Sequence, residues 1–202
     1  MSDAARGRLT QPPESYASLR AGRGPNALLA QAVELLAPSA GRALDIGAGP
    51  LNDALYLLEA GFAVDAVDTD PHTAALAAQL DDPRLTVARA DVRGFPIVPA
   101  TYALAVAIHV LPFLSRADLG RTVPAIVDGL AAGGVLCCTF LGSDDGWAGR
   151  RPRMTFLTRS EVRGLLSGLE PVVFTEHRYQ GVDAKDAPKH WHVLRCIFRK
   201  RR

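Results

Sequence analysis

The chain has 202 residues, of which 48% are hydrophobic and 22% are charged, and its formal net charge is +2. We expect one domain that buries about 70% of the surface exposed by the unfolded chain, without help from a metal or a disulfide. The small net charge disfavours a nucleic-acid partner, because neutralising phosphates requires a clear excess of Lys and Arg. The charge is uneven, since residues 1–100 carry 8 basic and 12 acidic side chains, whereas residues 101–202 carry 15 and 9.

Cysteine usage and hydropathy indicate the compartment. Three cysteines, with Cys137 next to Cys138, lack the spacing of metal ligands and predict buried thiols in a reducing compartment. The N-terminus has no signal-peptide core, and no run approaches the roughly 20 apolar residues of a membrane span. We therefore expect a cytoplasmic protein with no bound metal and no membrane partner.

Residues 1–24 are polar and rich in Gly, Pro and Arg, which indicates an N-terminal arm or lid in front of a domain at residues 25–202. Pro25 opens a segment of helical periodicity that Pro38 ends. From Arg42 onward, short apolar runs alternate with helical segments, as in βαβ units. The expected strands are Ala43–Ile46, Ala63–Val67, Leu85–Ala88, Leu104–Ile108 and Val135–Phe140, and the expected helices are Asp53–Glu59, His72–Leu80 and Asp118–Leu130.

The fourth strand lies in the run ALAVAI, whose continuous apolar character predicts a sheet covered on both faces. A polar loop at residues 142–154 follows the fifth strand, and Thr158 or Ser160 is a candidate cap for a helix at 161–169. Two strand-like runs at 171–177 and 190–198 complete the chain. The pattern predicts a doubly wound α/β sheet with an antiparallel edge and a ligand at its first strand-to-helix turn.

That turn follows the first strand and contains Gly47 and Gly49, which permit close backbone approach to a ligand. A dinucleotide fingerprint needs a third glycine where this chain has Asn52. A carboxylate at Asp45 is also badly placed beside a pyrophosphate but suits a cationic amino-acid group. The turn therefore favours a positively charged nucleoside cofactor over NAD or FAD.

Further acids follow the next two strands. Asp68 ends the second strand and can accept hydrogen bonds from ribose hydroxyls. Asp70 precedes Pro71, which favours an N-cap over a cofactor contact. Asp91 can accept from an adenine amine while the Val92 backbone N–H donates to a ring nitrogen; the alternative for Asp91 is a solvated loop acid.

Four motifs in order, LDIGAGPLN, VDAVDTD, RADV and LAVAIHVLPFL, resemble those of class I S-adenosylmethionine-dependent methyltransferases over about residues 25–200. The run LDIGAGPLNDALYLLEAGFAVDAVD is similar to the tellurite-resistance-type small-molecule methyltransferases. The resemblance implies a Rossmann-like, seven-stranded, mostly parallel sheet with an antiparallel last strand and helices on both faces. It also implies S-adenosylmethionine as cofactor and S-adenosylhomocysteine as product.

The resemblance further assigns cofactor contacts by position. The methionine portion would meet the glycine turn, the ribose the end of the second strand, and the methyl group the end of the fourth. The residues concerned are Asp45, Gly47, Ala48, Gly49, Asn52, Asp68, Thr69, Asp91, Val92 and Ala107. The family most often has another glycine at the position of Leu51, so this turn departs from its usual sequence.

A sulfonium methyl group is already activated, so alignment with the acceptor is the main task of such an enzyme. His109, just past the fourth strand, is the candidate catalytic side chain, because its pKa near neutrality suits a base or hydrogen-bond partner. The alternative is a packed histidine satisfied by a backbone group.

Candidate substrate contacts come from three segments. In the 142–154 loop, Trp147 can stack on an aromatic body and Arg153 can bind a carboxylate or phosphate, unless this is only a solvated basic loop. Tyr16 and Arg23 of the arm can close over the same opening. His190 and His192 are expected on one face of a strand. Because no third metal ligand is near them in sequence, we expect His192 to form part of the pocket wall or to pack at the edge of the sheet.

These features favour methyl transfer to a small anionic or aromatic acceptor, because little chain remains for recognition of RNA or protein. Two alternatives stay open. One is a catalytically silent S-adenosylmethionine-binding regulatory protein. The other is a biosynthetic enzyme that uses the same fold for non-methylating chemistry such as ring closure. The sequence does not predict an oligomeric state.

Overall fold

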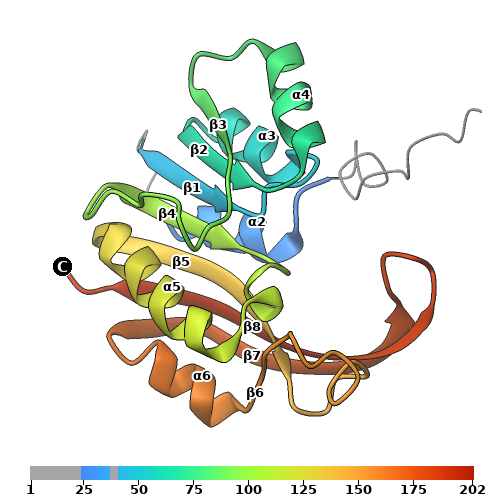
Figure 1. Ribbon diagram of the computed structural model, residues 1–202. Coiled ribbons are helices and arrows are strands. Elements are labelled where there is room, and N and C mark those ends of the chain that lie inside the picture. Colours follow the sequence, from blue (N-terminus) through green and yellow to red (C-terminus); the bar gives the residue numbers. More distant parts are fainter. Residues whose placement is uncertain (1–23, 37–40) are drawn as a thin grey trace, which may run out of the picture.

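The computed structural model describes residues 24–36 and 41–202 (Figure 1). Tyr16 and Arg23, with nearly all of the expected arm, lie outside the described residues. The strands are β1 (Arg42–Ile46), β2 (Ala63–Asp68), β3 (Leu85–Arg89), β4 (Tyr102–Ala107), β5 (Leu130–Gly142), β6 (Phe156–Leu157), β7 (Leu169–Val182) and β8 (Pro188–Lys200). The helices are α2 (Ala27–Glu34), α3 (Asn52–Glu59), α4 (Pro71–Leu80), α5 (Arg116–Gly129) and α6 (Arg159–Leu165), and η1 (Leu111–Phe113) is a 3-10 turn.

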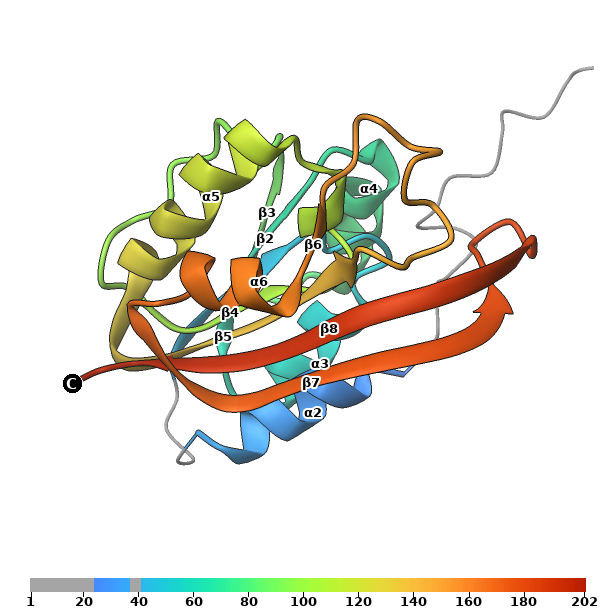
Figure 2. The same ribbon diagram turned by 90° about the horizontal axis from the view of Figure 1, so that it is seen from below.

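The strands form one sheet in the order β3-β2-β1-β4-β5-β8-β7, with β6 paired to the end of β5. Neighbours from β3 to β5 are parallel, and β8 is antiparallel to β5 and β7. Helices α2, α3 and α4 cover one face, and α5 and α6 cover the other (Figure 2). The doubly wound sheet with an antiparallel last strand is therefore confirmed, and β6 is an addition to the seven expected strands.

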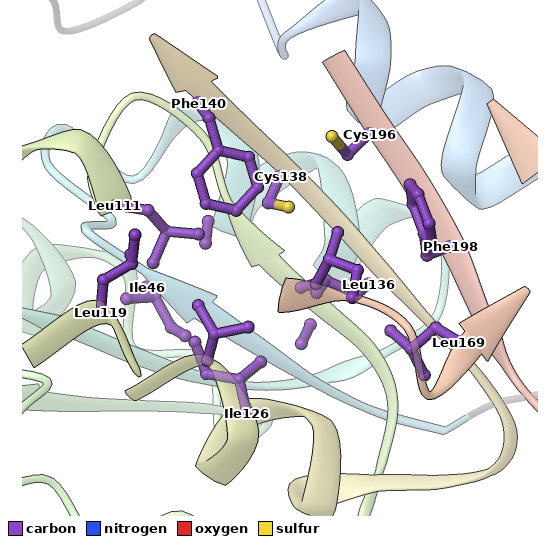
Figure 3. Packing of buried hydrophobic residues seen from close by; sticks show 14 of the residues in the cluster. Ile46, Leu111, Leu119, Ile126, Leu136, Cys138, Phe140, Leu169, Cys196 and Phe198 are labelled. Carbon is purple, nitrogen blue, oxygen red and sulfur yellow. The ribbon is translucent and has the colours of Figure 1, made fainter. Parts of the chain in front are cut away.

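The core consists of two apolar clusters, one on each face of the sheet. In β4, Leu104 and Val106 belong to one cluster, and Ala105 and Ala107 belong to the other, all fully buried. This alternation explains why the strand is apolar at every position. Figure 3 shows the cluster under α5 and α6, where β5 and β8 contribute buried thiols at Cys138 and Cys196.

Several boundaries differ from the predicted ones. β5 begins at Leu130 rather than Val135, and the last two strands extend into a long hairpin that ends at Val182 and Pro188. The fourth strand ends at Ala107, one residue early, because His109 turns the chain with a φ of 57°. No helix in the described part of the chain is long and apolar enough to span a membrane.

The sheet order reverses between β1 and β4, whose neighbours continue in opposite directions. In open α/β sheets, ligands bind at the carboxyl ends of the strands beside such a reversal. The turn after β1 and the segment after β4 are therefore where a site is expected.

Candidate functional site

The turn after β1 is formed by residues in the left-handed backbone region. Gly47 and Gly49 have φ of 73° and 47°, and a Cβ on Gly47 would lie 2.8 Å from the Val110 side chain. Leu51 also has a φ of 63°, a conformation that costs a non-glycine residue about 1–2 kcal/mol. Its side chain is 1% exposed, and burial of a leucine contributes about 1.5–3 kcal/mol. Core packing therefore offsets the strain where the usual glycine is missing.

Asp68, at the end of β2, fastens this turn. Its Oδ2 accepts the Gly49 N–H at 2.7 Å, and its Oδ1 accepts the Asp70 N–H at 2.8 Å. Thr73 lies in the first turn of α4, and its hydroxyl donates a hydrogen bond of 2.7 Å to the Gly49 carbonyl. Asp70 caps that helix by accepting the His72 N–H, which confirms the N-cap interpretation. The turn after β1 is thus held from the neighbouring strand and helix.

Beneath the turn lies a group of carboxylates. Asp45 is 2% exposed, and its Oδ2 has no hydrogen-bond partner among residues 24–36 and 41–202. Burial raises the pKa of Asp45 well above its ordinary value, and the nearby carboxylates of Asp53 and Asp68 raise it further. Burial also raises the pKa of Asp53, which accepts the Asn26 N–H at 2.9 Å. A buried carboxylate with an unsatisfied oxygen and acidic neighbours is costly in the free protein and favours a cationic ligand.

His109 stands at the end of β4. Its N–H donates to the Thr139 hydroxyl at 2.8 Å, and its left-handed backbone is one that histidine adopts more readily than most residues. The residue is exposed, and its ring centroid lies 6.1 Å from that of Trp191. The ring is therefore accessible from the space above the strand ends.

That space is a cavity of about 610 Å³. Gly47, Asp68, His109 and Asp183 line it. Aromatic rings from η1, the 142–154 loop, β7 and β8 line it as well, namely Phe113, Trp147, Tyr179 and Trp191. The ring centroids of Trp147 and Trp191 are 5.8 Å apart, and Tyr179 stacks on Trp191 at 6.3 Å. The volume suits a small organic ligand.

We call the rings of Phe113, Trp147, Tyr179 and Trp191 the aromatic wall. A buried ion pair contacts two of these rings. The Lys189 ammonium lies 3.0 Å from Asp145 and 3.2 and 3.8 Å from the ring centroids of Trp191 and Trp147. Asp145 also accepts the N–H groups of Trp147 and His192. Burial lowers the pKa of Lys189. The ion pair attaches the 142–154 loop to β8 and so fixes the position of Trp147 in the cavity wall.

Residues 43–134 match the family model described as a methyltransferase domain, and this segment includes the glycine turn, Asp68 and His109. Over this segment, a little under half of the chain, the protein is similar to methyltransferase domains. The comparison with curated proteins found no match.

Solved structures share the fold of this chain at low identity. TehB from Haemophilus influenzae is 17% identical with a TM-score of 0.72, and the match covers 87% of this chain and 62% of TehB. The 1,6-didemethyltoxoflavin-N1-methyltransferase of Burkholderia thailandensis is 24% identical with a TM-score of 0.65, covering 87% of this chain and 79% of that one. The [4+2]-cyclase SpnF is 16% identical with a TM-score of 0.64, covering 86% and 80%. The tellurite-resistance subfamily stays a prediction.

The fold brings several of the predicted site residues to one cavity, which Gly47, Asp68, His109 and Trp147 line. Ala48 and Ala107 are instead packed in the apolar clusters, 6% and 0% exposed, so only their backbones can face a ligand. Asn52 begins α3, and Thr69 is exposed beside Asp68.

Asp91 and Val92 lie after β3, at the expected adenine end. The Arg93 guanidinium donates to both Asp91 oxygens and lowers the pKa of that carboxyl. Val92 packs partly against the core below α5. An adenine amine would therefore meet an ionised carboxylate that Arg93 already shares.

Arg153 and His192 do not line this cavity. Arg153 lines another hollow beside Arg116 and Phe156. His192 is 2% exposed: its Nδ1 accepts the Asp144 N–H, and its Nε2 lies 2.7 Å from Glu176. The His192 ring also fills the space beside Gly142, where any Cβ would collide with it. His192 thus anchors the start of the 142–154 loop to β7, and its side chain does not line the cavity where the substrate is expected.

Five residues of the aromatic wall and its supporting ion pair were not predicted from the sequence: Phe113, Tyr179, Trp191, Lys189 and Asp145. Tyr179 and Trp191 become neighbours through the register of the β7–β8 hairpin. That register depends on a turn at residues 183–187 in which Asp183 accepts two backbone N–H groups. The alternation of Tyr179, Gly181, Lys189 and Trp191 along two strands was the available signal.

Proposed function

We propose that this methyltransferase transfers a methyl group from S-adenosylmethionine to a small-molecule acceptor with a flat aromatic body. The proposal is carried by one observation: Gly47, Asp68, His109 and four aromatic rings line a single cavity. The glycine turn in its wall adjoins buried carboxylates, and the rings offer a surface for a flat aromatic group. A cationic nucleoside and an aromatic acceptor can therefore meet beside His109.

The residues at the turn fit the cofactor. The orphaned Asp45 Oδ2 and the neighbouring carboxylates suit its ammonium and sulfonium charges. Each Asp68 oxygen accepts one backbone N–H and has a second lone pair for a ribose hydroxyl. When bound, S-adenosylmethionine supplies an activated methyl group, which the acceptor atom attacks in line as the carbon–sulfur bond breaks.

The remaining tasks belong to the acceptor side. The rings of Trp147, Trp191 and Tyr179 can hold a flat acceptor and exclude water, which aligns its nucleophilic atom. His109 can accept the proton that an O–H or N–H acceptor loses as the new bond forms. No other histidine in the described part of the chain lines this cavity.

The proposal is tested in two stages. Calorimetry should first give binding of S-adenosylhomocysteine, and failure to bind at millimolar concentration would refute the proposal. Incubation with methyl-labelled S-adenosylmethionine and a library of aromatic acceptors should then yield a labelled product whose mass is higher by one methylene unit. Cofactor binding without any labelled product would instead support a regulatory protein.

Tryptophan emission is expected to report acceptor binding directly. Trp147 and Trp191 are the two tryptophans of the chain, and both line the cavity. A bound aromatic acceptor should quench their emission, and Trp191→Phe should weaken its binding about 3- to 10-fold through poorer stacking. An acceptor that is turned over without changing the emission of the cofactor-saturated protein would place its site elsewhere.

His109→Ala is expected to lower kcat about 100-fold for an acceptor that must lose a proton, with little change in the affinity for S-adenosylhomocysteine. Because alanine is strained at a φ of 57°, His109→Asn serves as the matched variant that tolerates this backbone. Undiminished turnover in both would show that His109 is not catalytic.

Non-methylating ring closure is the second candidate. The [4+2]-cyclase SpnF has the same fold, and the largely apolar, aromatic cavity of this chain could equally shape a flexible substrate for cyclisation. The two functions differ in product mass, since cyclisation leaves the substrate mass unchanged and does not consume the cofactor.

A further inference from the structure

A second cavity, of about 350 Å³, opens on the other side of His109 and Tyr179, which line both cavities. Its wall comes from the first residues of α2 and from β5, β7 and β8, and it contains Asn26, Thr139, His177 and Arg195. No Asp or Glu among the described residues lines it. The space beside the expected methyl-transfer point is therefore polar and carries positive charge only.

Arg195 is the cation of this cavity. It is partly buried on β8, and register pairs place it between Thr139 of β5 and Thr175 of β7. No carboxylate in residues 24–36 or 41–202 lies within ion-pair distance of its guanidinium, in contrast to Arg178, which pairs with Asp144 and Glu176. A guanidinium held in a hollow without a carboxylate is suited to a planar anionic group of a ligand.

Other groups around the cavity are also compatible with an anion. The Thr139 hydroxyl accepts the His109 N–H, which leaves its own O–H to donate. His177 is held by a hydrogen bond between its Nε2 and the Thr175 hydroxyl at 2.9 Å. The acids Asp45, Asp53 and Asp68 lie at the glycine turn, none of them in the wall of this cavity. Asp53 nevertheless lies next to this cavity, because its Oδ1 accepts the N–H of Asn26 in the wall, and Asp183 lines the first cavity.

We propose that Arg195 binds a carboxylate of the acceptor, so that the preferred substrates are aromatic carboxylic acids whose ring lies against Trp191 and Tyr179. The proposal rests on the proposed methyl transfer and specifies its substrate class. An acceptor that lies beside His109 and Tyr179, which line both cavities, would have its nucleophilic atom close to the expected position of the methyl group. A carboxylate here has one other source, the amino-acid end of the cofactor, and the experiment separates the two.

The probes are naphthalene-2-carboxylate and its neutral isostere naphthalene-2-carboxamide, titrated by calorimetry into protein saturated with S-adenosylhomocysteine. The wild type should bind the acid about 10- to 100-fold more tightly than the amide, as expected for a charge-assisted, bidentate contact. Arg195→Met should abolish this preference, and Arg195→Lys should keep part of it. Arg163→Met, an exposed substitution on α6, should leave it unchanged.

A wild type that binds the acid no better than the amide overturns the proposal without any variant. If Arg195→Met weakens S-adenosylhomocysteine but not 5′-methylthioadenosine, which lacks the amino-acid end, the carboxylate belongs to the cofactor and the acceptor assignment is wrong. Failure of the wild type to bind S-adenosylhomocysteine would refute the proposed function itself. Normal cofactor binding without a preference for the acid would refute only this inference.

Discussion

Asp68→Ala is expected to weaken the binding of S-adenosylhomocysteine at least about 100-fold. The substitution removes the acceptor of the Gly49 N–H at 2.7 Å and of the Asp70 N–H at 2.8 Å. It also removes the oxygens proposed to accept from the ribose. Hydrogen bonds to a charged group contribute about 1.5–3 kcal/mol each, so losing two at the ligand and loosening the turn exceeds a factor of 100. Calorimetry on the purified protein measures the change directly.

Two further variants separate binding from folding. Asp68→Asn keeps one side-chain oxygen for the Gly49 N–H but loses the charge and one acceptor, and its affinity should lie between those of the wild type and Asp68→Ala. Asp128→Ala changes an exposed carboxylate at the end of α5 and should bind as the wild type does. An Asp68→Ala protein that keeps its thermal transition and its affinity would exclude Asp68 from the cofactor site.

The sheet could be predicted from sequence because its signal is local. The apolar run at 103–108 and the acids that follow each apolar run depend on neighbouring residues, and the structure places them as β4 and as the ends of β1 to β3. Where the predicted strand boundaries were wrong or a strand was not predicted, contacts between residues distant in sequence determine the structure. β6 exists only because Phe156 and Leu157 pair with Leu141 and Gly142 of β5, and no periodicity in two residues indicates that pairing.

The cofactor side of the site could likewise be predicted from the sequence, whereas the acceptor side could not. Gly47, Asp68 and His109 each lie within two residues of the end of a strand, and parallel strands bring their carboxyl ends to one edge. Lys189 and Asp145 are 44 positions apart and meet only when the 142–154 loop folds back on β8. Arg153 and Arg195 look alike in sequence, and only the sheet register shows that Arg195 lies beside His109.

The stability of the free protein should be limited by the same carboxylates that suit a cation. Asp45 is the buried member of the group, and its raised pKa means that its ionised form is disfavoured in the folded state. The folded protein therefore binds a proton at Asp45 more tightly than the unfolded chain. Stability contributed by that proton is present below the unfolded pKa of about 3.9 and is lost as the pH rises through the folded pKa.

Asp45→Asn is accordingly expected to change stability and binding in opposite directions. Where the wild-type Asp45 is ionised, the ligand-free variant should unfold roughly 3–10 °C above the wild type, because it removes a buried charge that costs about 1–3 kcal/mol and its amide can donate to neighbouring carboxylates. Its affinity for S-adenosylhomocysteine should fall about 10- to 100-fold, because the cofactor ammonium loses an ionic partner.

Thermal unfolding measured as a function of pH tests the cause. The difference between the two melting temperatures should shrink as the pH falls and the wild-type Asp45 becomes protonated, and saturating S-adenosylhomocysteine should reverse the sign of that difference. Asp65→Asn makes the same change on β2, but at a carboxylate that already pairs with Arg42 and accepts from the Tyr102 hydroxyl. That variant should lose stability at pH 7 and keep its affinity. If Asp45→Asn behaves in the same way, Asp45 is an ordinary structural acid and the cationic end of the cofactor binds elsewhere.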